Sequence, residues 1–466
     1  MKRMISLLVL VSVSCLNATT YYVATNGSDS NNGSQSAPFA TVAKGVSVAN
    51  AGDSVIVMDG TYGNNGVGYG NYVVTLSHSG TSSSWVTIQA QHRGMAILDA
   101  GSGPASSNTS CSGASSYFNL ANASFIAIQG FVIQHACDQG IQSNGSAHDV
   151  LIKWNEIRNV GQWFISDIYG RDGIYLNSSE KNFTFDGNTF HDIGRTGSNG
   201  VLANHDHGIY AAATGLTIIN NIFYNFPWGW SIQTSQGATN WLIANNDFIG
   251  PDSSTSFAGL IMLWETNSNI TMQNNIFYQP RGSALTSYQA SVSGSVFDHN
   301  MVYGVSAIGN PSGVSVGVGN LLGVNPQFNN PGGYDFTLKA GSPAIGAGVT
   351  ISSVVNDYNG VPRSAPYSMG AYQGGTPPSG PVITAISSSG VISVIITWTT
   401  DQPSTSFVKY GTTASYGSTT PVNAALVTSH SVTINGLSPN TTYHFAVGST
   451  NGSGVLTVSG DNAVSL

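Results

Sequence analysis

Apolar residues alternate with polar ones in short stretches along most of the chain, and six of these stretches share one asparagine position at spacings of 33, 33, 25, 29 and 25 residues. The aligned asparagines are Asn155, Asn188, Asn221, Asn246, Asn275 and Asn300. A period-two pattern indicates a β-strand with one buried face, and a strand repeated in this way buries that face by stacking on its neighbours. The pattern therefore predicts a solenoid of stacked strands, in which each asparagine amide hydrogen-bonds to the next one about 4.8 Å along the axis.

A second alternating stretch precedes each asparagine by 11 to 14 residues. Its outward residues are expected to form one column, Gln142, Tyr175, Tyr210, Gln233, Met262 and Thr286. Two positions earlier, Gly140, Gly173 and Gly208 stack in consecutive coils. Glycine in a strand often marks a close approach to the backbone, so these three predict either the floor of a groove or simple packing beneath a loop.

With these repeats, the chain resembles the right-handed parallel β-helix proteins of the pectate-lyase-like superfamily over about residues 20–373. The opening YYVATNGSDSNNGSQSAPFATVAKGVSVANAGDSVIVMDGTY is similar to the N-terminal cap of its secreted members, and NPQFNNPGGYDFTLKAGSPAIGAG is similar to the C-terminal end. An amphipathic cap helix is expected to begin at Pro38. Its apolar positions are Phe39, Val42, Val46 and Ala49. The resemblance implies an all-β chain: a single-stranded right-handed parallel β-helix with a cap helix, followed by a small β-sandwich.

The composition changes after the solenoid. Residues 19–373 form the predicted β-helix, residues 374–380 a Pro/Gly/Ser-rich linker, and residues 381–466 a module with strands at sandwich spacing. Trp398 in an early strand and Tyr443 within LSPNTTYHF resemble a fibronectin type III domain and its tyrosine corner. This module is expected to be a non-catalytic spacer or a weak binding module.

The first residues have the layout of a secretory signal peptide at positions 1–18: Lys2 and Arg3, then an apolar run, then the small residue Ala18. We therefore expect a secreted protein, extracellular or periplasmic. Lipidation of Cys15 is an open alternative that fits the preceding residues poorly. No later segment reaches the ~18 apolar residues of a membrane span.

Charged residues are scarce, since 13 Lys and Arg and 21 Asp and Glu make up 7% of the 466 residues. So few cations, with a net charge of −8, exclude the basic surface that binding to nucleic acid needs. In an oxidising compartment Cys111 and Cys137 are expected to form a disulfide, because two thiols without a histidine cluster make no zinc site. The few charged residues gather between Asp167 and His207, which points to a site there.

Asp172 and Asp206 each lead into a glycine of the predicted groove, one coil apart. This spacing predicts two carboxylates roughly 5–7 Å apart, a range that includes the retaining glycosidase geometry and approaches the inverting one. One of the pair then needs a raised pKa to act as general acid. His205 or His207 is a candidate acid/base or orienting group, and Glu265 is the reserve carboxylate. The alternative is that the two aspartates only cap turns.

Aromatic side chains cluster in or just beyond the same strands, where their faces suit either sugar rings or the core. Trp163, Trp228 and Tyr288 belong to this cluster. The residues expected to bind substrate are Tyr175, Tyr210, Gln142, Gln233, Trp230, Trp264, Arg171 and Arg195.

The leading hypothesis is a glycoside hydrolase that cleaves a neutral or weakly acidic polysaccharide, as a monomer and without a cofactor. The alternative is a calcium-dependent lyase, in which the resemblance implies that Asp172 and Asp206 hold the metal and a Lys or Arg is the base. No lysine occurs between Lys181 and Lys339, so Arg195, Arg281 or a His207/Tyr210 pair would have to act as base. A glycan-binding surface protein without enzymatic activity is the second alternative.

Overall fold

The structure is a computed structural model that describes residues 18–102, 111–162, 170–195, 205–250, 259–305, 308–309, 311–374, 380–390, 393–451 and 456–466. These ranges do not include residues 1–17 of the predicted signal peptide or residues 375–379 of the predicted linker. Trp163 and Asp167 also lie outside the described residues. No helix in the described part of the chain is long and apolar enough to cross a membrane.

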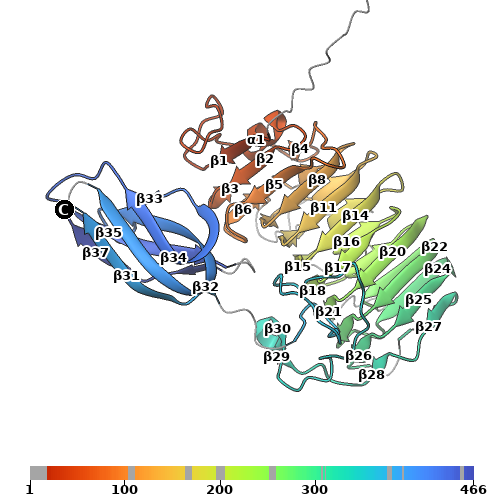
Figure 1. The fold of residues 1–466 in the computed structure, drawn as a ribbon. Coiled ribbons are helices and arrows are strands. Elements are labelled where there is room, and N and C mark those ends of the chain that lie inside the picture. The colour runs from red at the N-terminus through yellow and green to blue at the C-terminus, as the bar shows by residue number, and fades with distance from the viewer. Residues whose placement is uncertain are drawn as a thin grey trace, which may run out of the picture.

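The first three quarters of the chain wind into a parallel β-helix with three faces (Figure 1). The ladder face consists of β1 (Thr20–Val23), β2 (Ser54–Val57), β5 (Val86–Ala90), β8 (Ser124–Gln129), β11 (His148–Lys153), β14 (Lys181–Asp186), β17 (Thr217–Ile219), β20 (Ala238–Ala244), β22 (Ile261–Gln273), β25 (Ser295–Asp298) and β27 (Val314–Val316). The groove face consists of β4 (Tyr72–Thr75), β7 (Ser116–Asn119), β10 (Gln139–Ser143), β13 (Asp172–Leu176), β16 (Ile209–Ala211), β19 (Ile232–Thr234), the start of β22 and β24 (Leu285–Ser293). The third face consists of β3 (Gly60–Tyr62), β6 (Ala96–Asp99), β9 (Val132–Gln134), β12 (Glu156–Val160), β15 (Thr189–Ile193), β18 (Ile222–Tyr224), β21 (Asp247–Ile249), β23 (Ile276–Tyr278), β26 (Met301–Tyr303) and β28 (Leu321–Leu322).

The strand register agrees with the predicted alignment. On the groove face Gln142 pairs with Tyr175, Tyr175 with Tyr210, Tyr210 with Gln233, and Gln233 with Met262. The alternate positions of these strands, Ile141, Ile174, Ile209, Ile232 and Ile261, are buried in the interior. Period-two alternation therefore sets which side chains face inward in every coil.

Like side chains stack along the interior at the layer spacing. Phe190, Phe223, Phe248 and Phe277 form a column with ring centroids 4.8, 5.0 and 4.9 Å apart. Beside it, each predicted asparagine from Asn155 to Asn275 donates its Nδ2 to the Oδ1 of the next one along the axis. Asn320, which the repeat alignment missed, continues this ladder by accepting from the Asn300 amide. The predicted ladder is confirmed and is one rung longer.

The N-terminal cap helix α1 (Val42–Val48) starts four residues later than predicted. It starts there because Thr41 is its N-cap and accepts the Lys44 N–H through Oγ1. The predicted apolar positions Phe39, Val42, Val46 and Ala49 are all buried.

Beyond the hairpin of β29 (Phe328–Asn330) and β30 (Asp335–Leu338), the chain turns back along the solenoid toward its first coils. Val349 O accepts from Asn274, Arg363 donates to Asn220 Oδ1 at 2.8 Å, and the Tyr358 hydroxyl lies 2.7 Å from Thr189 Oγ1. We call residues 340–373 the return segment. It leads the chain back to the coils where the C-terminal module begins.

The C-terminal module is an antiparallel, curled β-sheet built on the long strand β32 (Val394–Gly411). Its other strands are β31 (Ile383–Gly390), β33 (Ser418–Thr419), β34 (Asn423–Ile434), β35 (Thr442–Thr450), β36 (Leu456–Val458) and β37 (Asn462–Ser465). Trp398 is buried against His430, and the Tyr443 hydroxyl accepts the Ser438 N–H. In Figure 1 the module lies beside the first coils, where Phe407 contacts His92 with ring centroids 5.1 Å apart.

Candidate active site

A cavity of about 460 Å³ opens at the corner where the chain passes from the third face to the groove face. The residues that line it come from β10, β13, β16, β19 and β22, from the turns before these strands, and from the loop before β4. They are Tyr69, Asp138, Gln139, Gly170, Arg171, Asp172, Tyr175, His205, His207, Tyr210, Gln233 and Trp264. Eight of the residues predicted for the site thus lie around one cavity, namely Asp172, His205, His207, Tyr175, Tyr210, Gln233, Trp264 and Arg171.

Aromatic rings form one wall of the cavity. Tyr175 and Tyr210 stack in consecutive coils with centroids 5.8 Å apart, and Trp264 follows 6.3 Å from Tyr210. These side chains are only partly buried. A row of half-exposed rings along parallel strands is suited to the apolar faces of consecutive sugar units.

Asp172 is buried and presents its carboxyl group to the cavity. Its Oδ1 accepts the His207 N–H at 3.1 Å, and within the described residues Asp172 forms no ion pair. Burial raises the pKa of this carboxyl well above its usual range, and the nearby charge of Asp206 raises it further. Asp172 is therefore protonated over a pH range in which ordinary aspartates are ionised.

Asp206 differs from the prediction, because Arg195 occupies its carboxylate. Arg195 donates from Nε to Oδ2 at 2.9 Å and from Nη2 to Oδ1 at 2.7 Å, and the backbone N–H groups of Arg171 and Arg195 donate to the same two oxygens. Both side chains of the pair are almost fully buried, and neither lines the cavity. The structure therefore does not bring Asp206 and Arg195 into the cavity lining, where catalysis and substrate binding were expected of them.

The strand register explains this difference. Ile174 pairs with Ile209, so Asp172 stacks against His207 and Arg171 stacks against Asp206. The one-residue offset between the two aspartates thus gives them different neighbours instead of two places in one groove.

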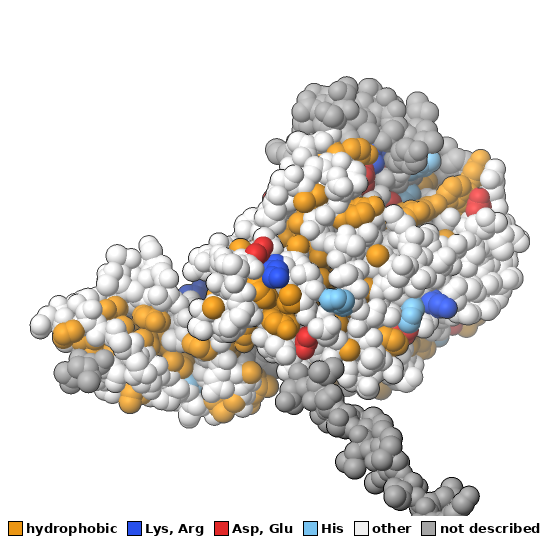
Figure 2. All heavy atoms as spheres, turned by 90° about the horizontal axis from the view of Figure 1, so that it is seen from above, with side chains coloured by type: hydrophobic (Ala, Val, Ile, Leu, Met, Phe, Trp, Pro, Cys, Tyr) orange, Lys and Arg blue, Asp and Glu red, His pale blue; other side chains and the backbone are white. Residues whose placement is uncertain are grey.

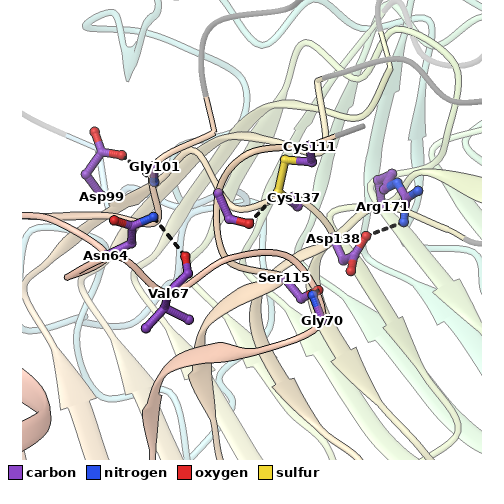
Figure 3. The surroundings of a disulfide bond; sticks show 11 residues. Asn64, Val67, Gly70, Asp99, Gly101, Cys111, Ser115, Cys137, Asp138 and Arg171 are labelled. Atoms are coloured by element: carbon purple, nitrogen blue, oxygen red, sulfur yellow. Dashed lines mark hydrogen bonds and ion pairs between the residues drawn. A yellow bond between two sulfur atoms is a disulfide. The ribbon is translucent and has the colours of Figure 1, made fainter. Parts of the chain in front are cut away.

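Asp138 is the carboxylate that the sequence analysis missed. It lies one coil before Asp172, lines the same cavity and forms an ion pair with buried Arg171 (Figure 3). The neighbouring Cys137 is joined to Cys111, as predicted, so a disulfide anchors the turn that carries Asp138 (Figure 3). Its signal was available: Asp138 precedes Gly140 by two residues, as Arg171 precedes Gly173 and Asp206 precedes Gly208.

His207 is buried in a fixed orientation. Its Nδ1 accepts the Trp230 backbone N–H at 3.2 Å, so the neutral ring carries its proton on Nε2. Burial holds its pKa well below the usual value, so the ring is neutral at physiological pH. Gly229 permits the close approach, because a Cβ there would lie 1.3 Å from the Asp206 carbonyl oxygen. In this tautomer His207 is a hydrogen-bond donor and not a base.

Four other predicted positions lie away from the cavity lining. Gln142 and Trp230 are buried, and the Trp230 ring packs on His207 at 5.3 Å. Glu265 lies at a bulge of β22, and Arg281 is exposed. Within the described residues, none of these four contributes to the cavity wall.

The stacked glycines are not a groove floor. A Cβ on Gly173 would lie 2.6 Å from Gly208 O and 2.9 Å from Ile193 Cδ1, and a Cβ on Gly208 would lie 2.5 Å from Ser231 O. Both would point at core side chains and the next backbone. The glycines therefore allow close packing of the coils, which was the alternative interpretation of the pattern.

A calcium site formed by Asp172 and Asp206 does not fit this geometry. Both oxygens of Asp206 already accept two hydrogen bonds each, and Asp138 faces the Arg171 guanidinium. Among the described residues, no three His, Cys, Asp or Glu side chains lie close enough together to hold a metal ion. Calcium needs six to eight oxygen ligands, which these residues do not supply.

Comparison with known proteins places the fold. The family model "Pel9A-like, right handed beta helix region" matches residues 21–199, and "Right handed beta helix region" matches residues 139–320. Residues 381–460 match "Purple acid Phosphatase, N-terminal domain", so the family named for the C-terminal module is not the expected fibronectin type III domain. The fold is a right-handed parallel β-helix, as predicted.

Solved structures to which this chain is similar include two polysaccharide lyases and a glycoside hydrolase. The crystal structure of pectate lyase Pel9A has a TM-score of 0.51 at 16% identity, covering 77% of this chain and 96% of that one. Alginate lyase from Paenibacillus sp. str. FPU-7 has a TM-score of 0.41 at 13% identity, covering 65% and 99%. The uncharacterized protein YwoF of Bacillus subtilis (strain 168) is 30% identical over 146 residues, which are 30% of this chain and 28% of YwoF. At these identities the likeness to the solved structures shows the fold alone.

Proposed function

We propose that this chain is a secreted glycoside hydrolase that cleaves an extracellular polysaccharide, with Asp172 as general acid and Asp138 as its carboxylate partner. The observation that carries the proposal is the contrast between two carboxyl groups in one aromatic-walled cavity. Burial favours the protonated form of Asp172, whereas Asp138 forms an ion pair with the buried Arg171 guanidinium. Two carboxyl groups in contrasting environments are the arrangement that acid and base roles need.

The proposed reaction follows from the different surroundings of the Asp172 and Asp138 carboxyl groups. Asp172 donates its proton to the glycosidic oxygen as the bond to the anomeric carbon breaks, and Asp138 either activates the attacking water or attacks the anomeric carbon itself. The Tyr175 and Tyr210 rings support the sugar, and His207 donates a hydrogen bond from Nε2.

Elimination is less well supported, because it needs a base. Burial raises the pKa of Tyr210, whose hydroxyl donates to Ser235 Oγ, so its phenolate is disfavoured. His207 carries its proton on Nε2, because its Nδ1 accepts the Trp230 backbone N–H. Arg195 forms an ion pair with Asp206. Tyr210, His207 and Arg195 are therefore protonated or occupied, and Arg281 does not line the cavity.

The test is a polysaccharide panel read by new reducing ends and by ultraviolet absorbance of unsaturated uronates. Hydrolysis gives reducing ends without that absorbance. Both signals together would mean elimination, and silence across the panel would mean glycan binding alone; either result overturns the proposal.

Asp172→Asn keeps the Oδ1 acceptor for the His207 N–H and should lower turnover about 10²- to 10⁴-fold with little change in thermal unfolding. The matched control is Asp149→Asn, which removes a partly exposed carboxylate hydrogen-bonded to His148 and should keep full activity.

Asp138 also neutralises buried Arg171, so Asp138→Gly is assayed with added azide, which supplies an anion in the space left by the carboxylate. Recovery of turnover with azide supports Asp138 as the partner, and failure of recovery in a folded variant contradicts it.

A further inference from the structure

A second cavity of about 510 Å³ lies at a different corner of the solenoid, where the chain leaves the ladder face for the third face. Its lining includes Arg93, Trp154 and Tyr358 together with Gln89 and Gln129 of β5 and β8. The return segment supplies Tyr358, and Thr450 and Leu456 of the C-terminal module border the same space. Three parts of the chain that are distant in sequence therefore form one cavity.

Arg93 is the unusual group in this cavity. Its guanidinium lies over the Tyr358 ring at 4.6 Å and faces the Trp154 ring at 5.7 Å, and within the described residues it donates only to the backbone carbonyls of Tyr358 and Gly187. Among the described residues it has no acidic partner. A half-buried arginine stacked on aromatic rings without a counter-ion is preorganised to bind a carboxylate.

Four other cations of the solenoid do have a carboxylate partner. Arg158, Arg171 and Arg195 each form an ion pair with a carboxylate, and so does Lys153, which lies over Trp154 at 4.4 Å. Buried Arg363 of the return segment instead donates to carbonyl oxygens such as Asn220 Oδ1 and Gly370 O, and it does not line this cavity. With charged residues at only 7% of a chain of net charge −8, a cation left without a carboxylate in a cavity indicates an anionic ligand.

The rest of the wall suits a sugar. Gln129 Nε2 donates to Gln89 Oε1 at 2.8 Å, and within the described residues the Gln89 amide nitrogen and the Gln129 carbonyl oxygen make no other side-chain hydrogen bond. Stacked amides of adjacent coils thus offer a donor and an acceptor for hydroxyl groups beside two half-buried aromatic rings. His92, held by Asp59 at 2.9 Å, packs against Phe407 and keeps the module beside this wall.

We propose that this cavity is a second binding site, separate from the candidate active site, that takes a uronate residue of an acidic glycan. Arg93 binds the carboxylate, the two glutamines bind hydroxyl groups, and the rings of Trp154 and Tyr358 border the sugar. The C-terminal module closes one side of the site, so glycan binding depends on both parts of the chain.

The test is calorimetric titration of the full chain carrying Asp172→Asn, in which cleavage is expected to be slow, with trimers of galacturonate and of mannuronate and with galactotriose as the neutral match. Arg93→Gln should weaken binding of a uronate trimer at least tenfold and leave galactotriose binding unchanged. If the candidate active site also binds the trimer, the Asp172→Asn chain has two binding events, and Arg93→Gln weakens only one of them. If the candidate active site does not bind it, the single binding event weakens, so the two proposals are tested separately.

Arg158→Gln is the matched control, because Arg158 is paired with Glu156, and it should leave binding unchanged. Should Arg93→Gln fail to fold, Gln129→Ala removes an amide whose only side-chain partner within the described residues is Gln89, and it should weaken binding at least threefold. Equal uronate binding by the parent chain and by folded Arg93→Gln, or no binding of either uronate trimer, would overturn the proposal.

Discussion

Burial controls the ionisation of the groups around the candidate active site. It raises the pKa of Asp172 and of Asp206 and lowers that of His207, so each group is shifted toward its neutral form. Only Asp206 has a bidentate cation, Arg195, to oppose this shift. Asp172 is thus a proton donor by its surroundings, and His207 has no charge change available near neutral pH.

This difference predicts the pH dependence of activity. The competent form of a general acid is the protonated one, so kcat/KM should fall as pH rises through the raised pKa of Asp172. His207 should add no rising limb between about pH 6 and 7, because its pKa is held well below that range. The measurement is a pH–rate profile of the wild type beside that of Asp172→Asn, whose residual activity should lack the falling limb. A wild-type rate that climbs steadily from pH 5 to 8 would contradict these assignments.

Residue identity was easier to predict than residue partnership. The cluster of charged and aromatic residues located the cavity correctly, because stacked coils bring like positions of successive repeats together. The alignment also placed Asp172 and Asp206 one coil apart, but side-chain partners depend on single-residue register and on Arg195, which lies in the turn after β15. Asp138 was missed because it precedes the stretch used for the alignment.

The asparagine ladder stabilises the coils as a hydrogen-bonded element. Asn221 donates to Phe185 O, Ile219 O and Asn246 Oδ1, and its own Oδ1 accepts the backbone N–H of Asn188. The repeat in the sequence predicted the bond from each asparagine amide to the next, because a buried amide supplies both a donor and an acceptor at every layer, but it did not predict the bonds to the backbone. The seventh rung escaped detection since the strand before Asn320 is short and its alternation weak.

Removing an interior rung should therefore be costly. Asn221→Ala leaves several buried backbone groups without partners, at about 1–3 kcal/mol each, so a loss of about 3 kcal/mol or more in unfolding free energy is expected. Asn320→Ala changes the last, partly exposed rung, where water can replace the amide, and should cost about 1 kcal/mol or less. Chemical denaturation of the two variants measures the contrast, and equal losses would show that the ladder does not act through burial.

At the scale of the whole molecule, charge is scarce because stacking places like positions about 5 Å apart, where rows of like charge repel. Figure 2 shows one face of the molecule, on which charged side chains are few and scattered. The return segment could not be predicted from periodicity, because it has none. Its hydrogen bonds to Asn274, Asn220 and Thr189 bring the module to the first coils.

One buried acid connects the return segment to the solenoid and should make stability pH-dependent. Asp247 Oδ1 accepts the Ala371 N–H at 3.1 Å, and burial raises the pKa of Asp247 from 3.8 to about 8. Because this folded-state pKa is raised, its contribution is fully present below about pH 4 and is lost as pH rises toward 8. Asp247→Asn, which stays neutral, should unfold at a higher temperature than the wild type at pH 8 to 9, by about 4 kcal/mol or less in free energy.

Asp298 is the control of opposite sign on the same solenoid. Backbone N–H groups of Gly319 and His299 lower the pKa of Asp298, so its ionised form stabilises the fold above about pH 4, and that stability is lost as pH falls. Asp298→Asn should therefore lower the unfolding temperature at pH 8, where Asp247→Asn raises it. Melting curves of the three proteins between pH 4 and 9 test both signs together. If Asp247→Asn melts below the wild type at pH 9 as well as at pH 5, the buried carboxylate is ionised and paired with Arg363 instead of neutral.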